Sequence, residues 1–221
     1  MIDSIVVLDD FYDNPDAIRH LALQQAFARK PNATYPGVEA FAADVDWEPV
    51  RRRMAESIPC DVSGPCPKNP PFRQGKFRIA VAADDATRLD GVHEDVQAWS
   101  GVVYLTPLDR HQRYDAVAFY RHRATGLCAS SDTWWLHVSA TLDLANLSAS
   151  ERQERYWAYM RDMSQWETIA QVENRYNRAL LLFAQRFHGS VGLFGTVPEN
   201  ARLTQHFEFY EPPQRSGDLR A

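Results

Sequence analysis

From Phe72 onward the chain contains many short runs of β-forming residues with few helical patterns between them. Turn residues separate the runs, so each predicts a strand of only a few residues. Strands that alternate with helices favour a parallel sheet, whereas successive short strands favour an antiparallel sandwich or a jelly roll. The predicted strands are residues 77–81, 99–105, 117–120, 166–172, 179–183 and 203–209.

The N-terminal part predicts a different kind of structure. Residues 5–8 form a short apolar strand, and Asn14 followed by Pro15 supplies the cap and first turn of a helix. A second helix is expected over residues 47–58. Residues 59–71 hold five prolines and a glycine and cannot be regular. We therefore expect a single domain, with helices and loops over residues 1–71 supporting a jelly-roll core over residues 72–211.

One helix is expected to interrupt the β-rich part. Residues 147–163 are rich in charged and aromatic side chains, and Ser148 or Ser150 can cap a helix there. This helix is an insertion between strands. The sequence leaves open whether it covers the mouth of a barrel or packs outside it.

Composition narrows the class of partner. The net charge of −5 gives no basic stripe for nucleic acid or anionic lipid, and no apolar run is long enough to span a membrane. The first residues show no signal-peptide pattern, so a cytoplasmic protein is expected. The three cysteines lack the spacing of a zinc site and are expected to be reduced structural thiols. A small-molecule or peptide partner is favoured, and nothing indicates the oligomeric state.

Residues 93–95 read His-Glu-Asp. On a strand, residues two apart point the same way, so His93 and Asp95 would lie side by side while Glu94 faces the other side. An imidazole and a carboxylate so placed supply two of the three ligands of a non-haem ferrous ion. The alternative is a surface His–Asp pair at a turn after Gly91.

Two later segments carry groups that complete such a site. His188 follows the predicted strand 179–183, and Arg202 opens the last long strand. Thr204 shares a strand face with Arg202, so a guanidinium fork and a hydroxyl can together bind a carboxylate. A jelly roll brings these separate elements to one mouth.

The sequence resembles the 2-oxoglutarate and iron(II)-dependent oxygenases, in layout the prolyl-hydroxylase-like branch and an uncharacterised bacterial family within it. The resemblance covers nearly the whole chain. Where relatives often carry a glycine turn before the Ala-Phe-Tyr strand, this chain has Asp115-Ala116-Val117. The similar segments are residues 9–15, 35–37, 93–95, 99–107, 118–123, 176–183 and 199–205.

The resemblance implies a double-stranded β-helix in which His93, Asp95 and His188 bind Fe(II). Arg202, with Thr204 beside it, would bind the C5 carboxylate of 2-oxoglutarate. The implied reaction uses O2 to hydroxylate or otherwise oxidise a small molecule or a peptide side chain, while 2-oxoglutarate becomes succinate and CO2. The carboxylate of Asp95 favours this outcome over halogenation, because a glycine or alanine there would open a halide site.

His206 is the rival for the second histidine ligand, since it shares the face of Arg202. We rank it below His188, because a ligand next to the oxoacid clamp would leave no room for the chelate. His206 is expected to be a satisfied core histidine or a partner of a ligand. The remaining candidates, His20, His111 and His137, have no partner pattern and are interpreted as ordinary residues.

Further polar residues are candidates for the pocket wall. By the resemblance Tyr35 and Tyr104 can line the pocket, although most aromatic residues of this kind are simply packed. Arg121 and Arg123 alternate on a strand and could present cations to a substrate carboxylate, or could belong to a solvated edge. The alternative function is a cupin-like β-sandwich that binds a metal or ligand without oxidising it.

Overall fold

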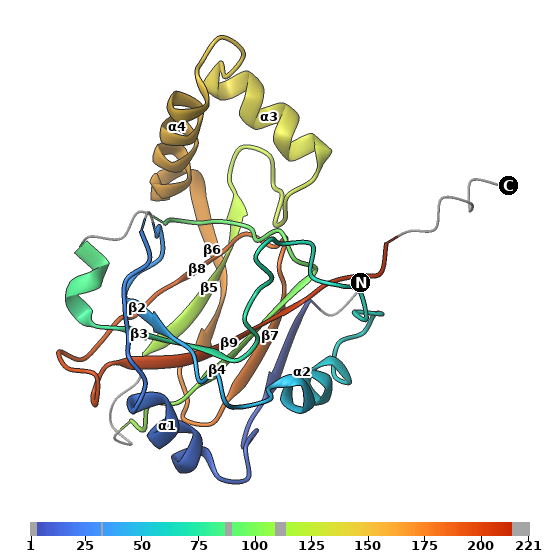
Figure 1. Ribbon diagram of the computed structural model, residues 1–221. Helices are drawn as coiled ribbons and strands as arrows, with labels where there is room; N and C mark the ends of the chain where they lie inside the picture. The colour runs from blue at the N-terminus through green and yellow to red at the C-terminus, as the bar shows by residue number, and fades with distance from the viewer. Residues whose placement is uncertain (1–3, 32, 87–89, 109–113, 214–221) are drawn as a thin grey trace, which may run out of the picture.

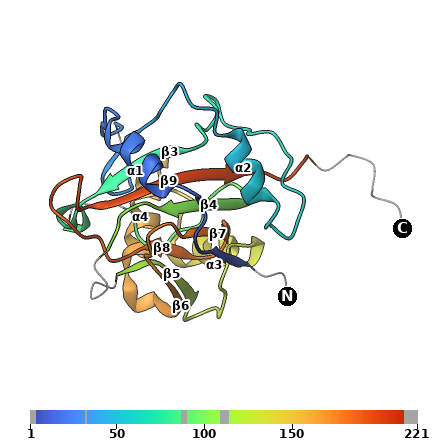
Figure 2. The same cartoon turned by 90° about the horizontal axis from the view of Figure 1, so that it is seen from below.

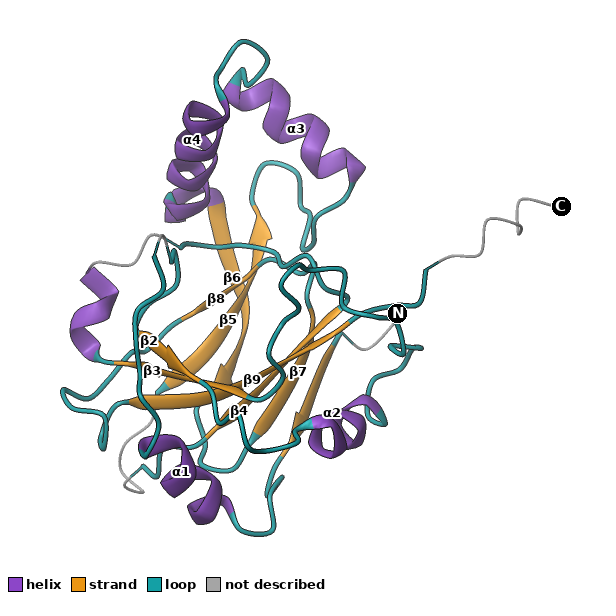
Figure 3. Ribbon diagram, in the orientation of Figure 1, coloured by secondary structure: helices purple, strands orange, loops and turns teal. Residues whose placement is uncertain are grey.

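A computed structural model describes residues 4–31, 33–86, 90–108 and 114–213. Within these residues the chain is mainly antiparallel β-structure with a few helices (Figures 1 and 3), as the spacing of short strands predicts. The strands are β1 (Ile5–Leu8), β2 (Val38–Ala40), β3 (Lys76–Ala80), β4 (Trp99–Tyr104), β5 (Asp115–His122), β6 (Trp166–Glu173), β7 (Ala179–Phe183), β8 (His188–Ser190) and β9 (Arg202–Phe209). The helices are α1 (Pro15–Leu23), α2 (Glu48–Ala55), α3 (Asp132–Leu142) and α4 (Ala149–Arg161), with short 3-10 turns η1 (Ala82–Ala86) and η2 (Met163–Gln165).

The strands form two sheets. The larger sheet has the order β1-β7-β4-β9-β3-β2, and the smaller sheet has the order β6-β5-β8. All pairings between these strands are antiparallel. An isolated bridge between His93 and His188 adds one more backbone segment beside β8. Figure 2 shows the layers: α1 and α2 lie on one side of the larger sheet and the smaller sheet lies on the other.

Alternation along the strands gives the larger sheet two different faces. The outward-facing side chains, such as Phe77, Leu203 and Phe207, join one apolar cluster with residues of α1 and α2. Toward the smaller sheet, Val102 and Leu180 pack against Phe119 of β5. The β3 and β9 part of this inner face carries charged residues instead, so the space between the sheets is apolar on one side and polar on the other.

The predicted helical insertion is present as α4, and Ser148 is its cap. The Ser148 hydroxyl accepts from the Glu151 amide at 3.3 Å, while the Glu151 carboxylate accepts from the Ser148 amide at 2.8 Å. The preceding helix α3 is not anticipated by the sequence analysis. Both helices project from one end of the sheets (Figure 1) and share an apolar cluster with the smaller sheet through Trp134, Met160 and Trp166. The insertion therefore packs against the smaller sheet at this end.

Two expectations from composition can be compared directly with the structure. Cys60, Cys66 and Cys128 are all free thiols. In the described part of the chain, each helix is too short or too polar to cross a membrane.

Asn177 joins the N-terminal segment to the β-core. Its side chain accepts from the Tyr12 amide at 2.8 Å and donates to the Tyr12 carbonyl at 2.9 Å. Its backbone is left-handed, with φ 62°, a conformation that asparagine tolerates better than most residues. The adjacent Arg178 forms an ion pair with Asp9, with Nε 2.6 Å from Oδ1. Residues near the N-terminus are thus fixed to the turn before β7.

We expect Asn177→Ala to lower the free energy of unfolding by about 2–4 kcal/mol, for two reasons. The change removes two hydrogen bonds, and it places at positive φ an alanine, whose side chain cannot form the local hydrogen bonds that help asparagine to adopt this conformation. Urea denaturation measures this loss. Asn177→Gly is the matched control, since it removes the same hydrogen bonds but accepts the backbone conformation, and should be about 1 kcal/mol less damaging. Equal losses in the two variants would show that the left-handed backbone contributes nothing.

Candidate metal centre

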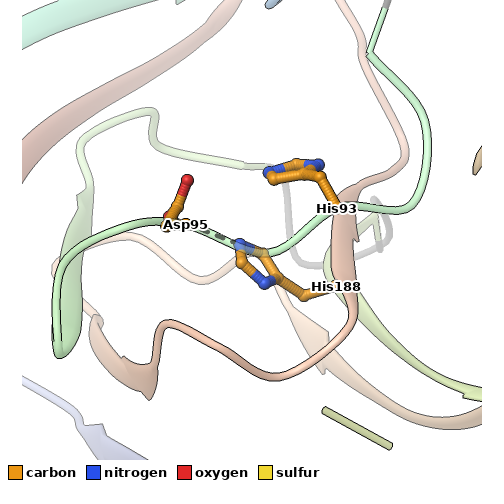
Figure 4. Close-up of side chains that lie close together, drawn as sticks. All are labelled: His93, Asp95 and His188. Carbon is orange, nitrogen blue, oxygen red and sulfur yellow. Dashed lines mark ion pairs between the residues drawn. The ribbon is translucent and has the colours of Figure 1, made fainter. Parts of the chain in front are cut away.

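His93, Asp95 and His188 converge on one point (Figure 4). One ligand atom from each residue lies within 4.8 Å of the others, and the described residues contain no other such group of three His, Cys, Asp or Glu side chains. These are the three residues that the sequence predicts as metal ligands. The structure brings them together from two segments that are far apart in the sequence.

Backbone hydrogen bonds set this arrangement. The His93 amide donates to the His188 carbonyl at 2.8 Å, and the His188 amide donates to the His93 carbonyl at 2.9 Å. Residues paired in this way across an antiparallel bridge project their side chains to the same face, and the two ring centroids are 4.5 Å apart. The Asp95 amide donates to the Ala184 carbonyl at 2.8 Å and fixes the third ligand.

The expected strand over residues 93–95 is reduced to the single bridge at His93. The predicted alternation holds for the side chains nevertheless. Glu94 points to the insertion, where its carboxylate accepts from the Tyr156 hydroxyl at 2.9 Å. The carboxylate of Glu94 is therefore engaged by α4, away from the three converging residues.

Both imidazoles are oriented by backbone carbonyls. Nδ1 of His93 lies 2.9 Å from the Gly91 oxygen, and Nδ1 of His188 lies 2.7 Å from the Arg186 oxygen. Because a carbonyl oxygen only accepts, each Nδ1 must carry the proton and donate it. In a neutral ring this leaves the lone pair on Nε2, the atom that can bind a metal. Nε2 of His188 lies 3.6 Å from Oδ2 of Asp95.

Two neighbours hold the Asp95 carboxylate. The Ser100 hydroxyl donates to Oδ2 at 2.9 Å, and the Gln97 amide donates to the same oxygen at 3.0 Å. Gln97 also donates to the Ser100 hydroxyl at 2.7 Å. Hydrogen bonds to a liganding carboxylate fix its orientation and increase metal affinity.

The pKa shifts of the three residues favour an ionised Asp95 and a neutral His93, the states that bind a metal, but they favour a protonated His188. Burial acts to raise the pKa of Asp95, but the hydrogen bond and charge of His188 outweigh it and hold that pKa well below its usual range. Burial and the neighbouring His188 lower the pKa of His93. For His188 burial is outweighed by Asp95, which raises its pKa. Asp95 is therefore ionised, and His188 would have to give up the proton that Asp95 favours in order to bind a metal through Nε2.

The three residues open into a cavity of about 130 Å³ between the two sheets. Its far wall is formed by β3 and β9 and carries three cationic side chains. The carboxylates among the described lining residues are those of Asp95 and Glu208. The full lining is Phe72, Lys76, Arg78, His93, Asp95, Gln97, Ser100, Gly101, Val102, Val117, Leu182, His188, Ser190, Arg202, His206, Phe207 and Glu208.

Arg202 lies in this wall and is only 6% exposed. Its Nη2 donates to the Ala116 carbonyl at 3.2 Å, and its guanidinium carbon lies 5.8 Å from the centre of the Tyr104 ring. Thr204 and Tyr104 are buried behind the cavity surface. Thr204 contacts the cavity indirectly, because its hydroxyl lies 2.9 Å from Nε2 of His206, which does line it.

His206 is separate from the three converging residues. Burial lowers the pKa of its ring far below the usual value, and the charges of Arg78 and Lys76 lower it further. His206 is therefore a neutral wall residue that is hydrogen-bonded to Thr204. This placement agrees with the ranking of His188 above His206.

The structure does not bring Arg121 and Arg123 to this cavity. Arg121 forms an exposed ion pair with Glu167 of β6, with Nη2 2.9 Å from Oε2. Arg123 is exposed beyond the end of β5. Both arginines are solvent-exposed, but the expected edge strand is wrong, because β5 is the central strand of the smaller sheet. Arg121 is neutralised by its cross-strand neighbour on β6.

Other wall residues were not selected from the sequence. Lys76 and Arg78 alternate with apolar residues on β3, opposite His206 and Thr204 of β9. The alternation of charged and apolar residues indicates that Lys76 and Arg78 share one face of a strand. Only the pairing of β3 with β9 shows that this face is the one that carries Arg202. Tyr35 is near this group, since the Arg78 guanidinium carbon lies 3.7 Å from the centre of its ring.

Comparison with known proteins places the chain in a family. Residues 2–207 match the family of unknown function DUF6445. The chain belongs to this family. No curated protein matches it. Among solved structures it is similar to the selenomethionine-labelled Fe(II)/(alpha)ketoglutarate-dependent dioxygenase TqaL, at 10% identity and a TM-score of 0.44, covering 99% of this chain and 86% of that chain.

Ser100→Ala tests whether the Asp95 carboxylate is held for a metal. Removing the hydroxyl frees Oδ2 on one side, so we expect the affinity for Fe(II) or Mn(II) to fall about tenfold, as is usual for a residue that supports a metal ligand. Competitive titration against a metal-sensitive dye measures the change. Thermal unfolding of the metal-free variant checks that the fold is retained.

Glu94→Gln is the matched control for that experiment. Glu94 stands between the two ligands in the sequence, but its side chain contacts Tyr156. Metal affinity should remain within about threefold of the wild-type value, since a distant charge is worth less than a direct hydrogen bond to a ligand. A larger loss in Glu94→Gln than in Ser100→Ala would contradict the assigned roles of the two residues.

Proposed function

We propose that this protein is a non-haem Fe(II)- and 2-oxoglutarate-dependent oxygenase that hydroxylates or otherwise oxidises a small molecule or peptide side chain. One observation carries the proposal: two oriented imidazoles and one carboxylate converge at a cavity whose opposite wall holds a buried arginine. Two histidines and a carboxylate on one side of a metal are the ligand set of Fe(II) oxygenases, and they leave positions for a chelating cosubstrate and O2.

The strand connections support a double-stranded β-helix for the core. Counting the His93 segment as a strand, the chain passes from the larger sheet (β3) to the smaller (His93) and back (β4). It then crosses to β5 and β6 of the smaller sheet, returns to β7, crosses to β8 and ends in β9. Eight strands that alternate in this way between two sheets are the pattern of a jelly roll.

The donor atoms fit a ferrous ion. Both histidines are held with Nδ1 on a carbonyl, so two neutral Nε2 atoms are available, and Asp95 supplies an anionic oxygen. These are nitrogen and oxygen ligands of the kind that Fe(II) accepts. Ser100 and Gln97 would keep the carboxylate turned toward the ion.

The opposite wall fits 2-oxoglutarate. Arg202 is buried, and a planar guanidinium can bind a carboxylate through two parallel hydrogen bonds. We propose that it binds the distal C5 carboxylate of 2-oxoglutarate, with Tyr104 and Thr204 positioning it from behind. The C1 carboxylate and keto oxygen would then point toward His93, Asp95 and His188.

The bound Fe(II) would supply oxygen activation, converting 2-oxoglutarate, O2 and a substrate C–H group into succinate, CO2 and a C–OH group. The chain's own residues bind and orient. Arg202 fixes the cosubstrate, and Val102, Val117 and Leu182 limit water on the apolar side of the cavity. Asp95 occupies the ligand position that would otherwise be open to a halide, which favours hydroxylation over halogenation.

Replacement of the two candidate histidines tests the ligand assignment. His188→Ala should abolish succinate formation from 2-oxoglutarate and weaken Fe(II) binding severely, because the ligands act as a unit. His206→Ala should keep Fe(II) affinity within about tenfold. Succinate formed in the presence of amino acids and short peptides is measured by mass spectrometry. Iron binding that is lost in His206→Ala and kept in His188→Ala would reverse the assignment.

Arg202→Ala tests the cosubstrate site separately from the metal. We expect 2-oxoglutarate affinity to fall by at least about 30-fold, since truncating one member of a buried charged pair costs roughly 2–5 kcal/mol. Fe(II) affinity should be nearly unchanged. Calorimetric titration of each ligand separates the two effects. Tight metal binding with no 2-oxoglutarate binding even in the wild type would instead support a cupin-like metal-binding protein.

A further inference from the structure

The cavity wall contains more positive charge than the proposed cosubstrate needs. Lys76 and Arg78 line it together with Arg202, while Asp95 and Glu208 are the carboxylates of the lining. Among the lining residues that the structure describes, three cations against two anions leave one positive charge. Behind the wall, the positive charge of Lys68, which contacts Glu208 at 2.6 Å, and the negative charge of Glu39 cancel each other. Lys30 also contacts Glu39, at 3.2 Å, but it is 64% exposed, so solvent screens its charge.

Loading the site keeps this excess. On the proposed function, a ferrous ion brings two positive charges and 2-oxoglutarate brings two negative charges, so their contributions cancel. His206 contributes no charge, because burial and its cationic neighbours lower the pKa of its ring far below neutrality. One uncompensated cation therefore remains for the substrate, and an uncompensated charge in a partly enclosed site is unfavourable unless a partner arrives.

Arg78 is the cation best prepared to receive that partner. One edge of its guanidinium donates to Glu39 at 2.8 Å, and its plane is supported by the Tyr35 ring. Its Nε is buried and has no hydrogen-bond partner among the described residues. A donor that is shielded from water and left unsatisfied is costly, and a ligand oxygen at the cavity surface would satisfy it.

Lys76 lies beside Arg78 but is more completely paired. Its ammonium contacts Glu39 at 2.7 Å and lies 4.6 Å from the centre of the Phe72 ring. The side chains of Lys76 and Arg78 are 14% and 19% exposed, so both reach the cavity without being free in solvent. On β3, Arg78 pairs with Thr204, two residues along β9 from Arg202. The two guanidinium groups thus occupy adjacent positions on one inner face.

We infer that the substrate carries one carboxylate, which binds at Arg78 and Lys76 beside the 2-oxoglutarate site. This inference rests on the proposed function and specifies its substrate class. The substrate-binding cations are thus placed on β3, as Lys76 and Arg78, and not on β5, where the sequence suggested Arg121 and Arg123. A single negative charge matches the excess, whereas a phosphate monoester would bring up to two.

Matched ligands test the inference without turnover. Fe(II)- and 2-oxoglutarate-loaded protein is titrated anaerobically by calorimetry with N-acetylglycine, N-acetylalanine, N-acetylleucine and N-acetylphenylalanine, each beside its primary amide. We expect at least one acid to bind about tenfold or more tightly than its amide, because a charge-assisted bidentate contact is replaced by a neutral one. Absence of any such preference across the panel would overturn the inference, as would tighter binding of phenyl phosphate than of benzoate.

Variants localise the effect. Arg78→Gln should reduce the acid preference to less than about threefold, and Arg78→Lys, which keeps the charge and the Glu39 pairing, should retain part of it. Lys30→Gln is the matched control: Lys30 contacts the same Glu39 at 3.2 Å but is 64% exposed and outside the cavity, so the preference should be unchanged. Thermal unfolding of each variant verifies the fold.

The same titrations separate this inference from the proposed function. If Arg78→Gln loses 2-oxoglutarate binding instead of acid preference, Arg78 belongs to the cosubstrate clamp and the inference is wrong while the oxygenase proposal stands. If the wild-type protein binds the acids through Arg78 but does not bind 2-oxoglutarate, the anion site stands and the oxygenase proposal is wrong.

Discussion

The pair of backbone hydrogen bonds between His93 and His188 is the constraint on which the rest of the site depends. These bonds attach the segment after Gly91 to the edge of the smaller sheet beside β8. They place two imidazoles on one face, and the neighbouring carbonyls of Gly91 and Arg186 then set the orientation of each ring. The main chain, and not a set of flexible side-chain contacts, therefore determines where the candidate ligands meet.

The two-faced larger sheet explains how a polar site is accommodated in a packed sandwich. Outward residues of β3, β4, β7 and β9 join the apolar cluster with α1 and α2. The inner face is apolar near β4 and β7 but charged near β3 and β9, where Glu39 is surrounded by Lys76, Arg78 and Lys30. Burial acts to raise the pKa of Glu39, but Lys76 and Arg78 hold it far below the usual range, so the carboxylate stays ionised.

The sequence predicted the longer strands and the order of the candidate ligands because both depend on local patterns. Runs of β-forming residues bounded by turn residues identify β3, β4, β7 and β9 to within a residue or two at each end. The sequence does not predict α3, because its tryptophans, valine and threonines are equally typical of a strand. Its N-terminal cap is also a weak sign, since it consists of the single hydroxyl of Ser131. The sequence offers Arg121 as a candidate and does not single out Arg78, because both lie on short strands and only the tertiary register shows which one faces the cavity.

The most direct test of the central claim is an anaerobic absorption titration of the Fe(II)-loaded protein with 2-oxoglutarate. If His93, Asp95 and His188 hold the iron and leave two adjacent positions for the keto acid, chelation should produce a weak visible charge-transfer band. The band should saturate at one cosubstrate per chain and be absent in His188→Ala. Tight Fe(II) binding without any such band in the wild type would contradict the account.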